Sequence, residues 1–172
     1  LKELALSLQT ESDYRVKCSI IRALQGYEYK DIHMVLLAST ADANPNVAEV
    51  AADYFVNRGQ EKDAAKYKAA MKDCKSWQAK TRLAEAANKN TTSMFSSVKT
   101  ALQNEILASL NAAKNPYEKA AWLKAWASEL RNFESIPKYT QPDQSIQVRT
   151  QAVTSLIDAC RDKNFDAYFA GE

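Results

Sequence analysis

The chain has 172 residues, of which 23 are basic and 21 acidic, giving a net charge of +2 at neutral pH. This balance argues against a polyanion such as nucleic acid, or an anionic membrane surface, as the main partner. No apolar run approaches the roughly 18 residues of a membrane-spanning helix. Three glycines and four prolines are too few for a sheet built on many tight hairpin turns. The composition therefore favours a helical protein.

In the first half of the chain, apolar residues recur with helical spacing between recognisable starts and stops. Helices are expected at 13–25, 30–40, 44–59, 61–73 and 76–88. We expect Asp13, Asn44 and Ser76 to cap three of these helices, with Pro45 at a first helical position. Gly26 and Gly59 should end helices, Gly26 through a positive φ angle.

The second half continues the same pattern with longer segments. Helices are expected over 94–113, 116–133 and 142–161, with an Asn115 cap before Pro116 and an apolar cluster at 165–169 that begins another element. The two prolines in 134–142 predict an irregular connection there. No stretch alternates with a period of two for long enough to compete as a strand, so the fold class is all-α, with about nine or ten helices.

Internal repetition is visible at two levels. Asp13-Tyr14-Arg15-Val16-Lys17 opens one helix, Asn44-Pro45-Asn46-Val47 opens another 31 residues later, and a third start follows near Ser76. Residues 16–24 also align without gaps to residues 148–156, where valine, a basic residue and leucine recur in register. A helix pair that recurs in this way buries its apolar face by stacking on its neighbours.

The pattern Asp-x-x-Val-Arg/Lys resembles the second helix of a HEAT repeat. The resemblance implies that Asp13 caps the helix, Val16 faces the core and Lys17 lies near an acidic group of a neighbouring repeat. The later copies depart from it: Ala48 stands at the basic position, Gln144 or Ser145 replaces the acid before Val148 and Arg149, and Gln78 stands at a valine position. The likeness covers residues 1–88 well and the rest loosely.

The resemblance implies a right-handed α-α superhelix of antiparallel helix pairs, a HEAT-like solenoid. We expect one array over residues 1–172, cut from a longer chain, with a possible break in phase at 134–142. A tetratricopeptide array and a compact helical bundle are the alternatives. The positions expected in the core are Val16, Ile20, Leu24, Val47, Val50, Leu83, Leu102, Leu130, Val148 and Leu156.

The expected function is that of a non-catalytic, monomeric scaffold that binds a protein or peptide on the inner helices of the array. The polar positions expected to face this partner are Lys17, Arg22, Glu49, Asp53, Lys80 and Glu85, with Tyr54 and Trp77 as aromatic anchors. Their mixed charge suits a polypeptide better than nucleic acid. The alternative is that these residues are only solvated surface.

Other residues that often carry chemistry have simpler interpretations. Trp122 and Trp126 lie four residues apart and are expected in the core. His33 is the only histidine and is expected to serve packing or the helix surface. Cys18, Cys74 and Cys160 are expected to be buried free thiols. No metal-ligand, phosphate-loop or nucleophile motif occurs in the sequence, so no metal, cofactor or catalytic residue is expected.

Two further alternatives remain. The asparagine-proline helix starts and aromatic helix ends resemble helical-repeat regions attached to cyclophilin-type peptidyl-prolyl isomerases of the bacterial envelope. That resemblance implies a client-binding role for this segment, a catalytic domain elsewhere in the chain and a periplasmic or envelope location; without it, a cytoplasmic location is expected. A HEAT-like DNA glycosylase, which would need a tryptophan beside a carboxylate on a basic surface, is the third possibility.

Overall fold

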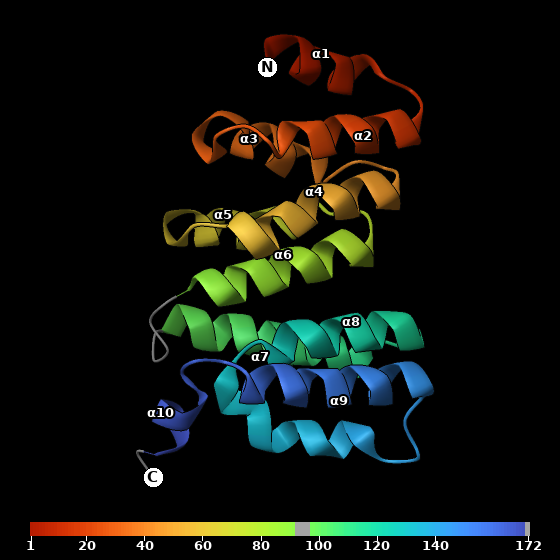
Figure 1. Cartoon of the computed structure of the whole chain (residues 1–172). Coiled ribbons are helices and arrows are strands. Elements are labelled where there is room, and N and C mark those ends of the chain that lie inside the picture. Colours follow the sequence, from red (N-terminus) through yellow and green to blue (C-terminus); the bar gives the residue numbers. More distant parts are fainter. Residues whose placement is uncertain (92–96, 171–172) are drawn as a thin grey trace. The chain divides into compact units, whose positions relative to one another are not determined.

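The computed structural model describes residues 1–91 and 97–170. Within these ranges every regular element is a helix, as the sequence predicts (Figure 1). Packing contacts divide the chain into two compact units, Leu1–Thr92 and Ser93–Glu172, called here the N-terminal and C-terminal units. Among the helices of the described ranges, none combines the length and the apolar character needed to cross a membrane.

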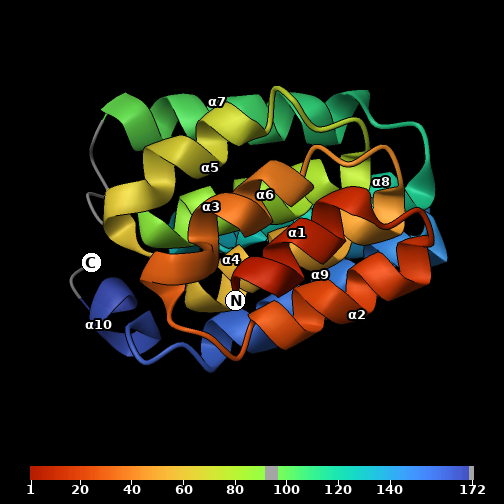
Figure 2. The same cartoon turned by 90° about the horizontal axis from the view of Figure 1, so that it is seen from above.

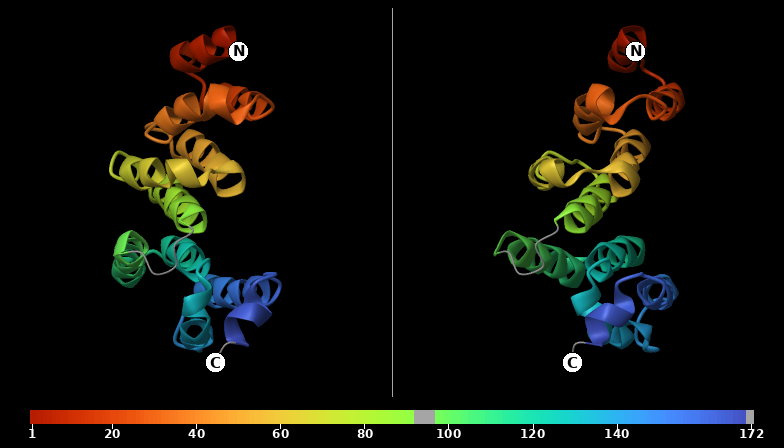
Figure 3. Two further views of the ribbon diagram at one scale, coloured as in Figure 1. Left: turned by 90° about the vertical axis from the view of Figure 1, so that its left-hand side faces the viewer. Right: turned by 60° about the vertical axis from the view of Figure 1, so that its left-hand side comes forward.

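The N-terminal unit consists of helix pairs in two layers. Its elements are α1 (Lys2–Thr10), α2 (Tyr14–Leu24), α3 (Tyr29–Ser39), α4 (Pro45–Arg58), the 3-10 helix η1 (Glu61–Asp63), α5 (Ala64–Ala70) and α6 (Trp77–Asn90). Helix α1 packs on α2, α3 on α4, and α5 on α6. Helix α4 also packs between α2 and α6, while α3 contacts α5. One layer therefore contains α2, α4 and α6, and the other contains α3 and α5 (Figures 2 and 3).

The expected helix starts of this unit are confirmed. Asp13 Oδ1 accepts a hydrogen bond from the Arg15 N–H at 2.8 Å, and Asn44 Oδ1 accepts one from the Asn46 N–H at 3.0 Å. Ser76 Oγ accepts one from the Ala79 N–H at 3.4 Å. Each cap satisfies a backbone donor that the helix itself leaves unpaired, a contribution of about 1 kcal/mol.

Small residues allow the close packing of α4 on α6. Ala48, Ala51 and Ala52 of α4 are fully buried, as are Ala79 and Ala86 of α6. Their short side chains bring the two helix backbones close together, while larger side chains fill the spaces beside them. The core positions expected at Leu24, Val47 and Leu83 are confirmed as buried.

The expected burial of Val16 is wrong, because this side chain is 41% exposed. Helix α2 instead buries Cys18, Ile21 and Leu24, and Ile20 is only half-buried. The neighbouring helix α1 is short and contributes one buried residue, Leu8, so it leaves part of α2 uncovered. Val50 of α4 is half-buried as well.

Glycine has a different role here from the one expected. No described residue has a positive φ angle, so the expectation for Gly26 is wrong. Gly59 does end α4, but for a packing reason. A Cβ atom on Gly59 would lie 2.4 Å from the Phe55 carbonyl oxygen and 2.6 Å from Asn90 Nδ2. Only a residue without a side chain fits between the end of α4 and α6.

The C-terminal unit consists of α7 (Ser97–Ala112), α8 (Pro116–Ala127), the 3-10 helix η2 (Leu130–Thr140), α9 (Ile146–Cys160) and α10 (Phe165–Phe169). Helix α8 packs against α7 and α9, and η2 packs against α9. Ring contacts of Phe133 with Phe165 and Phe169, at 5.0 and 5.5 Å, hold α10 against η2. The expected start of α7 at residue 94, including Phe95, lies outside the described residues.

Two expectations for this unit are corrected. The helix expected to reach Phe133 ends at Ala127, and most of the expected irregular stretch belongs to η2. Asn132 Nδ2 donates to the Trp126 carbonyl oxygen at 2.8 Å, which satisfies a carbonyl at the end of α8 and favours termination there. Pro137 lies inside η2 and lacks the N–H that an α-helix would need at this position, so a continuous α-helix through it is disfavoured.

Burial in this unit agrees with part of the expected core. Leu102, Val148, Trp122 and Trp126 are buried as expected. Leu130 and Leu156 are only half-buried, because α9 buries Val148, Ala152, Ser155 and Ala159 instead of the stripe that contains Leu156. The position of η2 and α8 beside α9 determines which face is covered.

Candidate functional site

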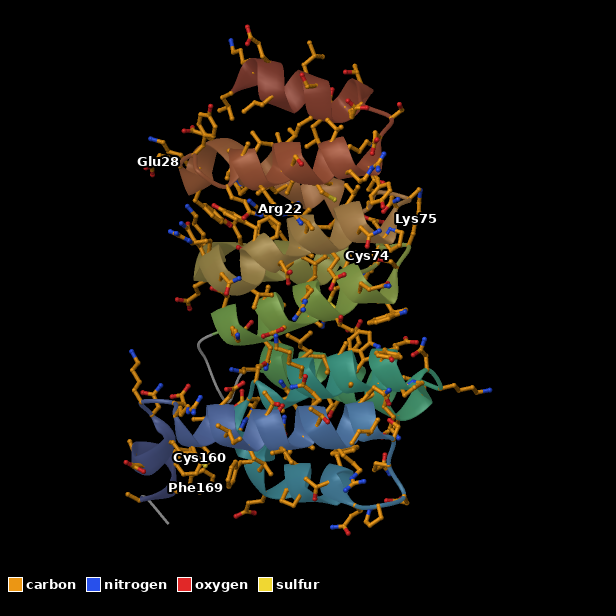
Figure 4. The ribbon with its side chains drawn as sticks, turned by 45° about the vertical axis from the view of Figure 1, so that its right-hand side comes forward. Arg22, Glu28, Cys74, Lys75, Cys160 and Phe169 are labelled. Atoms are coloured by element: carbon orange, nitrogen blue, oxygen red, sulfur yellow. The ribbon has the colours of Figure 1, made fainter. Side chains whose placement is uncertain are left out.

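One surface depression of the N-terminal unit lies between α2 and α4. A cavity of about 420 Å³ is lined by Arg22, Gln25, Val50, Asp53, Tyr54, Asn57 and Arg58. A second, of about 410 Å³, is lined by Tyr14, Arg15, Cys18, Ser19, Arg22, Asn46, Glu49 and Val50. Because Arg22 and Val50 line both cavities, the two form one depression, which we name the α2–α4 groove. Figure 4 shows Arg22 between the ribbons of α2 and α4.

Helix geometry explains why polar residues line this groove. Ile21 and Leu24 turn the apolar face of α2 toward the core, and the alanines of α4 do the same on the neighbouring helix. Side chains at the edge of each buried face point along the seam between the two helices. These edge positions carry Ser19 and Arg22 on α2, and Glu49 and Asp53 on α4.

Arg82 of helix α6 pairs with the two acidic residues of the groove. Arg82 Nε lies 2.8 Å from Asp53 Oδ1, and Arg82 Nη2 lies 3.8 Å from Glu49 Oε1. Burial raises the pKa of Glu49 and the charge of Asp53 raises it further, while Arg82 acts in the opposite direction. Since Arg82 belongs to the next helix pair, these contacts also join α4 to α6.

The basic side of the groove is not neutralised in the same way. Within residues 1–91 and 97–170, the guanidinium groups of Arg22 and Arg58 form no hydrogen bond or ion pair, and both side chains are exposed. Each arginine lies in the last turn of its helix, where the helix dipole favours a cation. Two charged groups that point into one cavity are therefore available to a ligand.

The groove contains four of the eight expected partner-binding residues: Arg22, Glu49, Asp53 and Tyr54. Tyr54 is only 6% exposed and its ring stacks on Tyr29 at 6.1 Å, so it forms part of the wall and does not project as an anchor. The expected outward position of Glu85 is wrong, because Glu85 is 3% exposed and pairs with Arg82 and Lys89.

The other three expected residues lie elsewhere. Lys17 lines a separate cavity of about 330 Å³, where its Nζ lies 2.8 Å from Asp42 Oδ2. Trp77 and Lys80 are half-buried and line none of the three cavities described here. Their roles in binding stay predictions.

Arg82, Arg58 and Asn57 were not expected at this site from the sequence. Arg82 had a signal: it follows Asp53 by 29 residues and Glu49 by 33, close to the 31-residue offset between the helix starts. Opposite charges one repeat apart therefore indicated a contact between successive helix pairs. Arg58 and Asn57 carried no comparable signal, because their placement depends on where α4 ends.

A second polar group, which we name the Tyr29 cluster, lies among α3, η1 and α5. Tyr29 Oη donates to Asp63 Oδ2 at 2.8 Å and lies 2.6 Å from Tyr67 Oη. Tyr67 Oη in turn accepts from the Gln60 N–H at 2.9 Å. Burial raises the pKa of Tyr29, and its bonds to Tyr67 and Asp63 raise it further, so the phenol keeps its proton and donates.

Asp63 anchors this cluster, with 2% of its surface exposed. Lys66 Nζ lies 2.7 Å from its second oxygen, Oδ1. Burial raises the pKa of Asp63, but the hydrogen bonds from Lys66 and Tyr29 outweigh that effect and hold it below the usual value. His33 stacks on the Tyr29 ring at 5.0 Å and its Nδ1 lies 3.1 Å from the Tyr29 carbonyl oxygen, which agrees with the expected packing role.

The described ranges contain no group of three His, Cys, Asp or Glu side chains placed to hold a metal ion. The cysteines are free thiols, as expected, but only Cys18 is buried; Cys74 is half-buried and Cys160 is exposed. Trp122 Nε1 lies 3.4 Å from Glu118 Oε1, yet Trp122 and Trp126 are both buried and present little surface for stacking on a base.

Comparisons of the chain with models of known protein families, with curated proteins and with solved structures give no match.

Proposed function

We propose that this chain is a HEAT-like helical-repeat scaffold that binds an extended polypeptide segment in the α2–α4 groove. The observation that carries the proposal is the groove itself: two joined cavities along one helix seam, lined by side chains of both charges. Backbone N–H and C=O groups of an extended segment need donors and acceptors in alternation, and a mixed-charge polar groove offers both.

The packing of the N-terminal unit supports the repeat-scaffold part of the proposal. Successive helix pairs stack so that α2, α4 and α6 form one layer, the arrangement expected of repeats that contact only their neighbours. Lys17 of one pair lies 2.8 Å from Asp42, which precedes α4 of the next pair. The HEAT resemblance implies this kind of contact between a basic residue and the neighbouring repeat.

The dimensions of the groove support a polypeptide partner. Each cavity is in the size range of small-ligand pockets, but both are open and mostly polar, with no enclosed apolar chamber between α2 and α4. A chain of successive side chains, each in a shallow site, fits such a surface better than one compact molecule does.

Site-directed photocrosslinking tests the proposal. A photoreactive amino acid replaces Ser19, an exposed lining residue of the groove, or Lys72, an exposed residue between α5 and α6. The full chain is irradiated with a mixed-sequence decapeptide pool, and adducts are measured by mass spectrometry. We expect adducts at position 19 well above those at position 72. Equal yields at both positions, or none at position 19, would remove the groove as the binding site.

A further inference from the structure

We infer that the cavity at the end of α2 binds a side-chain carboxylate of the partner polypeptide between Arg22 and Arg58. The inference rests on the proposed function, since it names the chemistry of the segment that the groove receives. Both arginines line this cavity, and within the described residues neither guanidinium has an acidic partner. Arginine pairs with carboxylates through two parallel N–H donors, so two arginines offer more donors than one carboxylate needs.

The charges around the cavity support an anionic occupant. Asp53 is the acidic residue of its lining, and Arg82 already pairs with it at 2.8 Å. The guanidinium groups of Arg22 and Arg58 line the same cavity without a carboxylate of the described residues bonded to either of them. A ligand carboxylate would supply the acceptor that both groups lack.

The neutral groups of the lining suit a carboxylate as well. Gln25 Nε2 donates one N–H to the Val50 carbonyl oxygen at 3.5 Å, and Asn57 Nδ2 donates one to the Asp53 carbonyl oxygen at 3.2 Å. Each amide group carries two N–H donors, so one donor in each remains for a ligand oxygen. The wall formed by Tyr54 and Val50 gives the methylene groups of a glutamate an apolar surface.

The groove continues past Arg22 into the second cavity, so it has room for a segment that extends beyond the acidic residue. Arg15 of the second cavity lies seven residues from Arg22 along α2, or about 10 Å at 1.5 Å per residue. An extended peptide covers that distance in about three residues. A segment with its acidic residue at Arg22 and Arg58 would thus reach the position of Arg15 about three residues away.

The test uses the immobilised full chain and N-acetylated, C-amidated decapeptide pools. One pool has Glu fixed at the fifth position and the other has Gln there, at an ionic strength near 0.15 M; the retained peptides are quantified by mass spectrometry. A charged hydrogen-bonded contact predicts retention of the Glu pool at least about fivefold above the Gln pool. Arg22→Gln and Arg58→Gln should each reduce this ratio toward one. Arg149→Gln, which removes an exposed arginine of α9, should leave it unchanged.

The outcomes separate the inference from the proposed function. Equal retention of both pools, above an empty surface, would overturn the carboxylate site and leave groove binding intact. No retention of either pool would overturn both. A Glu preference that survives both arginine substitutions would place the carboxylate elsewhere and overturn the inference. A third pool has Gln at the fifth position and a free C-terminal carboxylate. Retention of this pool equal to that of the Glu pool would overturn the assignment to a side-chain carboxylate.

Discussion

Two groups of polar side chains lie beside α4, and they differ in whether their charged groups are buried and paired. In the Tyr29 cluster, Asp63 is buried and its oxygens have partners from Tyr29 and Lys66. In the α2–α4 groove, Arg22 and Arg58 are exposed, and no acidic group within the described residues pairs with them. Tyr54 belongs to both, since its ring stacks on Tyr29 and also forms a wall of the groove. The carboxylate of Asp63 is therefore already satisfied within the fold, whereas the guanidinium groups of Arg22 and Arg58 are free to contact a ligand.

Substitution of the two aspartates should give the largest difference. Asp63→Ala removes a buried carboxylate and leaves Tyr29 and Lys66 without their acceptor, so we expect a loss of about 2–3 kcal/mol in unfolding free energy. Asp53→Ala removes a half-exposed carboxylate from the groove and should cost less than about 1 kcal/mol. Urea unfolding followed by circular dichroism measures both. Equal losses would mean that the two polar groups do not differ in the way proposed.

Substitution of Gly59 and of Gly26 should change stability by different amounts, and this difference should be of intermediate size. Gly59→Ala places a methyl group against the Phe55 carbonyl and Asn90, next to the Tyr67 ring of the cluster, and should destabilise by about 1–3 kcal/mol. Gly26→Ala, beside the groove, brings its methyl group no closer than 3.4 Å to the Ala23 carbonyl oxygen and should change stability by less than about 0.5 kcal/mol. Thermal melts of the two variants check this. An unchanged melting temperature for Gly59→Ala would show that the backbone at the end of α4 can shift to accommodate a methyl group.

The pH dependence of stability should have opposite signs at the two sites. The pKa of Asp63 is lowered from 3.8, so its stabilisation is present above pH 3.8 and is lost as pH falls through the folded-state value. The pKa of Glu49 is raised from 4.5, so its contribution is present below pH 4.5 and is lost as pH rises through the folded-state value. Asp63→Asn should reduce the loss of unfolding free energy that occurs below about pH 4. Glu49→Gln should remove a small decrease in unfolding free energy that occurs as the pH rises above 4.5. Urea titrations from pH 3 to 6 measure both slopes, and matching signs would contradict the assignment.

The smallest change in the free energy of unfolding is expected on substitution of the groove arginines. Arg22→Gln and Arg58→Gln each remove only an exposed cation in the last turn of a helix, so the free energy of unfolding should change by less than about 0.5–1 kcal/mol. Differential scanning calorimetry on each variant is the measurement. A loss above 2 kcal/mol in either variant would show that the arginine stabilises the fold and would remove the basis for a binding role.

The sequence predicts the helices well, because caps and stops are local. Asp13, Asn44 and Ser76 start helices through bonds to N–H groups two or three residues away, so nearby residues are sufficient to identify them. The end of α8 was harder, because it depends on Asn132, a residue beyond the helix that reaches back to the Trp126 carbonyl.

Which face of a helix is buried depends on its neighbours, and the sequence predicts this less well. Residues 16–24 and 148–156 align without gaps, yet Val16 is exposed and Val148 is buried. Helix α2 packs against α4 and the short α1, whereas α9 packs against α8 and η2, so different faces of the two aligned segments are covered. The same limit applies to the site, where Glu85 has the spacing of a surface residue but is enclosed by Arg82 and Lys89.

Chemical-shift mapping of the full chain tests the central claim, that the α2–α4 groove binds a polypeptide, most directly. A glutamate-containing, C-amidated decapeptide is titrated into the ¹⁵N-labelled protein, and the backbone amide signals are followed to saturation. We expect the largest shifts at Arg22, Val50 and Asn57, while the amides of α5 beside the Tyr29 cluster stay within error. Shifts centred on α5, or no shift at any groove amide with the peptide in large excess, would contradict it.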